Sequence, residues 1–181
     1  MSSILLTYTK LPAMGVLPRR ALPSDVRIEL AEPAVHAMTD FTREYPVTID
    51  EERQIDAALA DMVRLGVRAM LVAREQKVVG FISSYDIEGE RPLQYLQNSN
   101  YTRHRDLQVG HIMTPWADLL TLNWRAVKDA CVGDLVETFR HTDVMHLIVI
   151  ETAADDTTYV RGLFSKSRIE RQLGMSRAMS A

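Results

Sequence analysis

The sequence predicts an α+β fold built from one structural unit used twice. Two observations carry this prediction. The segment GFISSYDI, residues 80–87, returns as GLFSKSRI, residues 162–169, and HAMTDF, 36–41, returns as HIMTPW, 111–116, 75 positions later. Two motifs that recur in the same order indicate internal duplication. The chain has 181 residues, which is long enough for two small units that share a core.

The first copy is expected to run strand, helix, strand, strand, helix. A short extended piece, 46–50, precedes a helix over 51–65, which Gly66 would end. Strands 68–73 and 77–83 flank a charged turn, and a helix restarts over 84–96. The first helix repeats apolar residues along one face, and these are Ile55, Ala58, Leu59, Met62 and Val63.

The second copy repeats this order. We expect a strand over 119–122, a helix over 126–140, strands over 145–151 and 158–165, and a helix over 166–174. The second copy is longer mainly in the polar segment 151–158, which indicates a longer hairpin loop. Val127, Cys131 and Leu135 recur every four residues, so the single cysteine is expected to be a buried structural thiol.

Composition narrows the class of protein. Apolar residues make up 46% and charged residues 25%, and the net charge of -3 gives no basic footprint for nucleic acid. No apolar run approaches the roughly 18 residues of a membrane span, and one cysteine fits a reducing compartment, so a cytoplasmic location is expected. We divide the sequence into an N-terminal tail, 1–25, a first repeat, 26–100, and a second repeat with its preceding linker, 101–181.

The ordered set of motifs resembles a tandem pair of cystathionine-beta-synthase (CBS) domains, also called a Bateman module. The matching elements are HxMT before each unit, VTID and LLTL as first strands, and GVRAMLVA and DVMHLIVI as second strands. Each unit ends with GFISSYD, 80–86, or GLFSKSR, 162–168, which we call the first and second closing segments; the resemblance covers roughly 34–174. The resemblance implies two repeats packed sheet against sheet around a pseudo-twofold axis, with two clefts between them. It also implies a homodimer and, in many relatives, binding of AMP, ATP or S-adenosylmethionine.

The chemistry of the first closing segment supports a nucleotide site. A strand that ends at Ser83 and turns into a helix presents backbone N–H groups that suit a phosphate. One turn later, the carboxylate of Asp86 can accept two hydrogen bonds from a ribose diol. The alternative is helix capping, because a serine cap and an acidic first turn stabilise a helix by about 0.5–2 kcal/mol without any ligand.

The second closing segment carries Arg168 where the first carries Asp86. A guanidinium has only donors, so it cannot accept from a diol. Either the second cleft is empty, or Arg168 and Lys166 favour anionic groups there, or Arg168 is an ordinary solvated arginine.

By position, the resemblance implies adenine contacts near the first strand and the start of the second strand of each repeat. Thr121 and His146 would line the second site. The full set of predicted ligand-binding residues is Val47, Thr48, Ile49, Met70, Ser83, Ser84, Asp86, Thr121, His146, Ser165, Lys166 and Arg168.

No set of serine, histidine and acid has catalytic spacing, and no phosphate-binding loop is present, so an enzyme is not expected. His141, Asp143 and His146 span a helix end and a strand start, which argues against a metal site.

We expect a regulatory module that binds AMP, ADP, ATP or S-adenosylmethionine, needs no other cofactor, and signals to a regulated protein through its shape or partner affinity. The alternative is a ligand-free scaffold for dimerisation.

Overall fold

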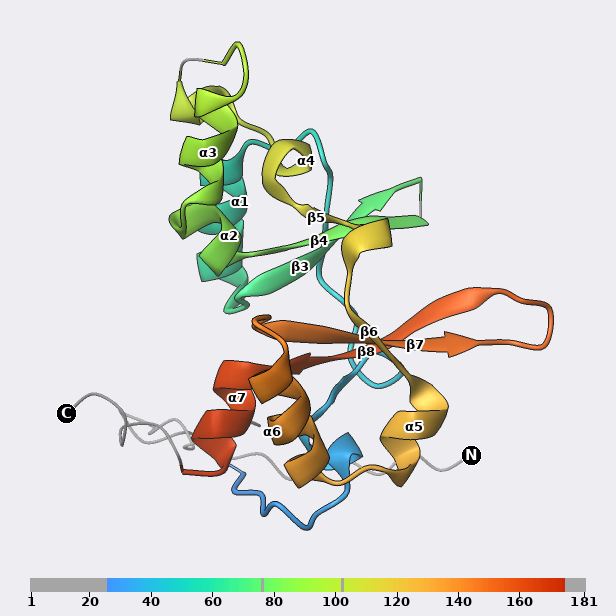
Figure 1. Cartoon of the computed structure of the whole chain (residues 1–181). Helices are drawn as coiled ribbons and strands as arrows, with labels where there is room; N and C mark the ends of the chain where they lie inside the picture. Colours follow the sequence, from blue (N-terminus) through green and yellow to red (C-terminus); the bar gives the residue numbers. More distant parts are fainter. Residues whose placement is uncertain (1–25, 76, 102, 175–181) are drawn as a thin grey trace, which may run out of the picture.

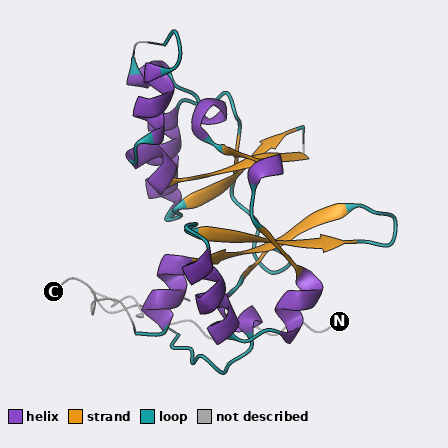
Figure 2. Cartoon of the chain, in the orientation of Figure 1, coloured by secondary structure: helices purple, strands orange, loops and turns teal. Residues whose placement is uncertain are grey.

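The computed structural model describes residues 26–75, 77–101 and 103–174, and the predicted tail, 1–25, lies outside them. The described chain forms two lobes, each with one sheet and its own helices (Figures 1 and 2). The elements that form the first lobe are β2 (Thr48–Ile49), α1 (Ile55–Leu65), β3 (Ala69–Arg74), β4 (Lys77–Ser83), α2 (Ser84–Glu88), α3 (Arg91–Gln97), η3 (His104–Asp106), α4 (Val109–Ile112) and β5 (Thr114–Pro115).

The second lobe repeats the pattern after the short 3-10 helix η4 (Trp116–Asp118). Its elements are η2 (Ala34–Ala37), β1 (Thr39–Asp40), β6 (Thr121–Asn123), α5 (Trp124–Asp129), α6 (Val132–His141), β7 (His146–Thr152), β8 (Thr158–Ser165) and α7 (Lys166–Gln172). The predicted order of strand, helix, strand, strand, helix is confirmed in both copies.

The two sheets have the same topology. The strand orders are β2-β3-β4-β5 and β1-β8-β7-β6. The first strand of each repeat pairs in parallel with the second, and the other pairs are antiparallel. Both hairpins also change register at equivalent places, between Val72 and Ala73 and between Val149 and Ile150. The duplication read from the sequence therefore extends to the details of strand pairing.

Each sheet borrows its edge strand from the other half of the sequence. β1, which comes before the first strand-helix-strand-strand-helix unit, pairs with β8, and β5, which comes before the second such unit, pairs with β4. The close approach of these edge strands explains why both closing segments begin with glycine, Gly80 and Gly162. A Cβ at Gly80 would lie 2.7 Å from the Thr114 carbonyl oxygen, and one at Gly162 would lie 2.6 Å from that of Thr39.

The inner faces of the two sheets pack against each other. Leu71 and Phe81 from the first lobe and Ile148 from the second form a buried cluster between the sheets. Separate cores lie between each sheet and its own helices. This agrees with the expected sheet-against-sheet packing. The end of β4 and the start of β7 lie close together where the two sheets meet, since the rings of Phe81 and His146 are 5.1 Å apart.

The prediction of one continuous helix over 126–140 is wrong, because the helix is interrupted between α5 and α6. The Asp134 carboxylate accepts the backbone N–H of Cys131, which starts a new helix at that point. Cys131 is therefore the N-cap of α6 and is only partly buried, whereas Val127 and Leu135 are core residues as expected.

The first helix begins later than predicted and buries a narrower face. The carbonyls of Glu51 and Arg53 accept hydrogen bonds from the start of α4, so the helix begins at Ile55. Gly66 ends it with φ 68°, as expected. Val63 was expected on the buried face but is 77% exposed, since it lies about 100° around the helix from Met62. The helix predicted over 84–96 divides into α2 and α3.

Candidate functional site

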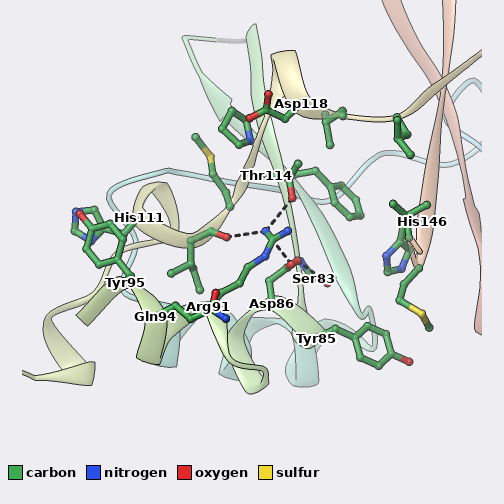
Figure 3. Close-up of a pocket in the computed structure, with 18 of the residues that line it drawn as sticks. Ser83, Tyr85, Asp86, Arg91, Gln94, Tyr95, His111, Thr114, Asp118 and His146 are labelled. Atoms are coloured by element: carbon green, nitrogen blue, oxygen red, sulfur yellow. Dashed lines mark hydrogen bonds and ion pairs between the residues drawn. The ribbon is translucent and has the colours of Figure 1, made fainter. Parts of the chain in front are cut away.

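A cavity of about 690 Å³ lies where the two lobes meet, and it contains part of the first closing segment (Figure 3). One wall comes from the end of β4 and from α2 and α3, and another from α4 and β5. The segment before β6 and the start of β7 complete the lining from the second half of the sequence. A ligand in this cavity would therefore contact both repeats.

Asp86 lines the cavity, but its carboxylate is engaged by the protein itself. Oδ2 accepts the backbone N–H of Ser83 at 2.8 Å and the Ser83 hydroxyl at 2.6 Å. Oδ1 pairs with Nη1 of Arg91 at 3.0 Å, and the side chain is only 15% exposed. The capping role that was left open from the sequence is thus present in this state.

These contacts leave little acceptor capacity for a ligand. A carboxylate offers about four acceptor positions, and three are occupied at Asp86. The backbone N–H of Ser84, expected to face a phosphate, instead donates to the Arg68 carbonyl at 2.9 Å. The phosphate and ribose contacts assigned to this segment remain predictions, and each requires a group of the protein to change its partner.

Sequence reasoning missed Arg91, which lies at the centre of the cavity lining (Figure 3). Besides the pair with Asp86, its Nη1 donates to the Thr114 hydroxyl at 2.9 Å and to the Ile112 carbonyl at 3.0 Å. The only local signal was a basic residue before Pro92 at the start of a helix. Its partner Thr114 lies 23 residues further along the chain, so no local pattern could predict the contact.

The cavity lining has an excess of carboxylates. Asp86, Asp118 and Asp143 line it, and Arg91 is its single arginine or lysine among the described residues. His146 adds no charge near neutral pH, because burial lowers its pKa from 6.5 to about 4, although the nearby Asp86 acts in the opposite direction. The described lining therefore carries one guanidinium and three carboxylates.

His146 lines this cavity, to one side of Asp86 and Arg91, although the sequence predicted it at the second site. The structure places its ring 5.1 Å from that of Phe81 and 6.4 Å from that of Tyr85. The start of β7 approaches the end of β4 of the other repeat, and this packing between sheets brings His146 into the cavity that contains Asp86.

A second group of rings lies on the opposite side of Arg91 (Figure 3). Tyr95 stacks on His111 with a centroid distance of 4.8 Å, and Tyr101 contacts both rings. Nδ1 of His111 accepts the backbone N–H of Gln108 at 3.1 Å. This contact gives His111 a structural role at the start of α4, at a place where it also lines the cavity.

The second closing segment has a different arrangement. Nη1 of Arg168 donates to the hydroxyl of Thr39 at 2.7 Å, and Ser165 pairs with Ser167 at 3.2 Å. A second cavity of about 490 Å³ lies beside α5 and the end of β7, but neither it nor the larger cavity includes Ser165, Lys166 or Arg168.

Of the twelve predicted residues, Ser83, Asp86 and His146 line the larger cavity. Val47, Ile49 and Met70 pack in the core of the first lobe instead. The other residues outside the cavity are Thr48 and Thr121, exposed on β2 and β6, Ser84, buried at the start of α2, and the three residues of the second closing segment.

Within the described ranges, no group of three or more histidine, cysteine or acidic side chains could hold a metal ion. Over the same residues, no helix combines the length and apolar character that a membrane crossing requires.

Comparisons with known proteins identify the domain and the fold. Residues 38–90 match the family model of the CBS domain. The fold is similar to that of an uncharacterized conserved protein from Pyrococcus horikoshii, with 19% identity, a TM-score of 0.55, and coverage of 83% of this chain and 96% of that one.

It is also similar to CBSX2, a CBS-pair protein from Arabidopsis thaliana, with 20% identity, a TM-score of 0.51, and coverage of 80% and 96%. A CBSX2 structure in complex with AMP matches with 22% identity, a TM-score of 0.52, and coverage of 80% and 97%. A search of curated protein sequences gave no match. The chain therefore contains a CBS domain at residues 38–90 and has the fold of a tandem CBS pair.

Proposed function

With the tandem CBS fold as the premise, we propose that this chain is a regulatory module that binds an adenosine-containing nucleotide in the larger cavity. The observation that carries the proposal is the composition of the lining, which joins Ser83 and Asp86 of the first repeat to His146 of the second. A ligand that contacts both repeats stabilises one arrangement of the lobes by its differential affinity. The output is a change in shape or in affinity for a regulated protein.

Size and surface chemistry support a nucleotide. A volume of about 690 Å³ lies within the usual range of roughly 300–1,000 Å³ for small-molecule sites. Tyr85 lines the cavity and is 39% exposed, so its ring offers aromatic surface for a base. The neutral His146 carries one donor and one acceptor nitrogen. A protein of similar fold, CBSX2, has been solved with AMP.

Charge favours a ligand with few phosphates. Arg91 is the one guanidinium among the described lining residues, against the carboxylates of Asp86, Asp118 and Asp143. One bidentate guanidinium matches a single phosphate group, whereas each further phosphate adds repulsion from the carboxylates. AMP fits this balance better than ADP or ATP. S-adenosylmethionine, whose sulfonium is positive, is also compatible with it.

Thermal unfolding with each ligand tests the proposal. A ligand at about 100 times its Kd should stabilise the native state by about 2.7 kcal/mol and raise Tm accordingly. We expect the largest rise with AMP, and smaller ones with S-adenosylmethionine, which lacks a phosphate, and with ADP and ATP without added Mg²⁺. Unchanged Tm values with every adenosine compound would refute the proposal.

A ligand-free scaffold is the second candidate, and the capped state of Asp86 favours it, because the carboxylate already has partners within the protein. Both functions are compatible with a homodimer. Sedimentation equilibrium and thermal unfolding, each measured with and without AMP, separate them together, since a scaffold would form a dimer but show no change in Tm with AMP.

A further inference from the structure

We infer that Arg91 is an exchange residue, which transfers its guanidinium from Asp86 to the phosphate of the incoming nucleotide and so releases Asp86 for the ribose diol. The inference rests on the proposed function and names the groups that recognise the ligand. Neither the phosphate contact nor the role of Arg91 follows from the closing-segment motif, in which Ser83 and the helix start were expected to bind the phosphate.

The contacts of Arg91 identify it as the group that can move. Its Nη1 contacts acceptors on three elements, Asp86 on α2, Ile112 on α4 and Thr114 on β5. Its side chain is nevertheless 46% exposed, whereas the other donor to Asp86, Ser83, is 3% exposed and held by the end of β4. A ligand can therefore displace the guanidinium more readily than it can displace the serine.

The acceptor capacity of Asp86 makes the exchange necessary. Two diol hydroxyls need two acceptor positions, and Ser83 and Arg91 together leave about one of the four. If Arg91 leaves, two positions become free, and the two hydroxyl donors replace the lost charge-assisted hydrogen bond. The released guanidinium then meets a phosphate, the acceptor to which its planar geometry is suited.

Neither half of the exchange is favourable by itself. A nucleoside without phosphate must displace Arg91 from Asp86 without offering the guanidinium a new anion. A phosphate compound without a diol withdraws Arg91 and leaves the part-buried carboxylate of Asp86 without a charged partner, which is costly. The site therefore recognises the phosphate and the diol as one combination.

The exchange also couples the ligand site to the second lobe. Through Ile112 and Thr114, Arg91 connects α3 to the segment that continues through η4 into β6. When Arg91 changes partner, both of these hydrogen bonds change with it. Nucleotide binding is thus coupled to the connection between the lobes.

Calorimetric titration of AMP, adenosine and 2′-deoxyadenosine monophosphate into the full chain and its variants tests the inference. Because charge-assisted hydrogen bonds are strong, the wild type should bind AMP at least about tenfold more tightly than adenosine. In Arg91→Ala, AMP should lose this advantage and adenosine should bind more tightly than to the wild type, since Asp86 is no longer occupied. Arg64→Ala, which removes an exposed arginine paired with Asp61 away from the cavity, should behave like the wild type.

Arg91→Gln provides a second variant, because its amide can still donate to Thr114 or Asp86 but carries no charge. It should also lose the preference for AMP over adenosine and should retain the preference for AMP over its 2′-deoxy analogue. If both variants keep the wild-type ratio of AMP to adenosine affinity, the exchange is refuted while nucleotide binding stands. If the wild type binds neither AMP nor adenosine, the proposed function itself fails.

Discussion

Arg168 donates a hydrogen bond to the hydroxyl of Thr39 across 2.7 Å and 129 positions of the chain, as Arg91 does to the equivalent Thr114 at 2.9 Å. A guanidinium thus occupies the same place in both halves. In the first half, Arg91 also pairs with the carboxylate of Asp86. In the second half, Arg168 itself occupies the sequence position equivalent to Asp86.

The first prediction is a stoichiometry of one nucleotide per chain. Arg168 cannot accept from a diol and already donates to Thr39, so the second closing segment offers no ribose site. Calorimetric titration with AMP should give one site, and Arg168→Ala should leave its Kd within about threefold while costing about 0.5–1.5 kcal/mol of stability from the lost hydrogen bond. Two equal sites per chain would contradict this assignment.

The second prediction concerns Asp86 in the absence of ligand. Asp86→Ala removes the acceptor for Ser83 and the partner of Arg91, so we expect the free energy of unfolding to fall by about 1–3 kcal/mol. Urea denaturation measures this change, with Glu88→Ala on the exposed side of the same helix as the control. A variant as stable as the wild type would show that the capping contacts contribute nothing. The same substitution should abolish nucleotide binding.

The third prediction is a pH dependence that comes from His146. Its folded pKa, about 4, lies below the unfolded value of 6.5, so the unfolded chain binds more protons between these values. The contribution of His146 to stability is complete above about pH 6.5 and is lost as pH falls towards 4.

A shift of this size corresponds to about 3 kcal/mol in total, at roughly 1.4 kcal/mol per pKa unit. His146→Gln should therefore lose less stability than the wild type between pH 6.5 and pH 4, as measured by urea denaturation. Direct titration by NMR should find the His146 ring neutral at pH 5.5, and a charged ring at that pH would refute the buried position.

The fourth prediction tests the pairing of β4 with β5, the edge strand that comes from the second half of the sequence. In Gly80→Ala the new methyl group would lie 2.7 Å from the Thr114 carbonyl oxygen and from Sδ of Met113, so β5 would have to move. Overpacking of this kind costs about 1–3 kcal/mol. In Gly133→Ala the nearest atom is 3.4 Å away and the site is helical, so urea denaturation should find little or no loss. Equal stability of the two variants would argue against the pairing of β4 with β5.

The sequence by itself determined the duplicated unit, the order of its elements, the longer second hairpin and the end of α1 at Gly66. These features depend on local patterns, such as apolar periodicity and turn residues, that are set within a few positions of the chain. The break at Cys131 was missed because one capping carboxylate, Asp134, overrides a continuous helical pattern. The residues of the closing segment were identified, but whether they cap a helix or face a ligand was left open.

Tertiary structure alone decided which half of the chain supplies each edge strand and which side chains share the cavity. β1 and β5 have two residues each, too few to show a periodicity, and they pair with strands distant in sequence. Arg91 and His146 enter the site for a related reason. Thr114, a partner of Arg91, and Phe81, the ring beside His146, come from elements distant in the sequence. Such contacts depend on how the elements pack rather than on any spacing along the chain.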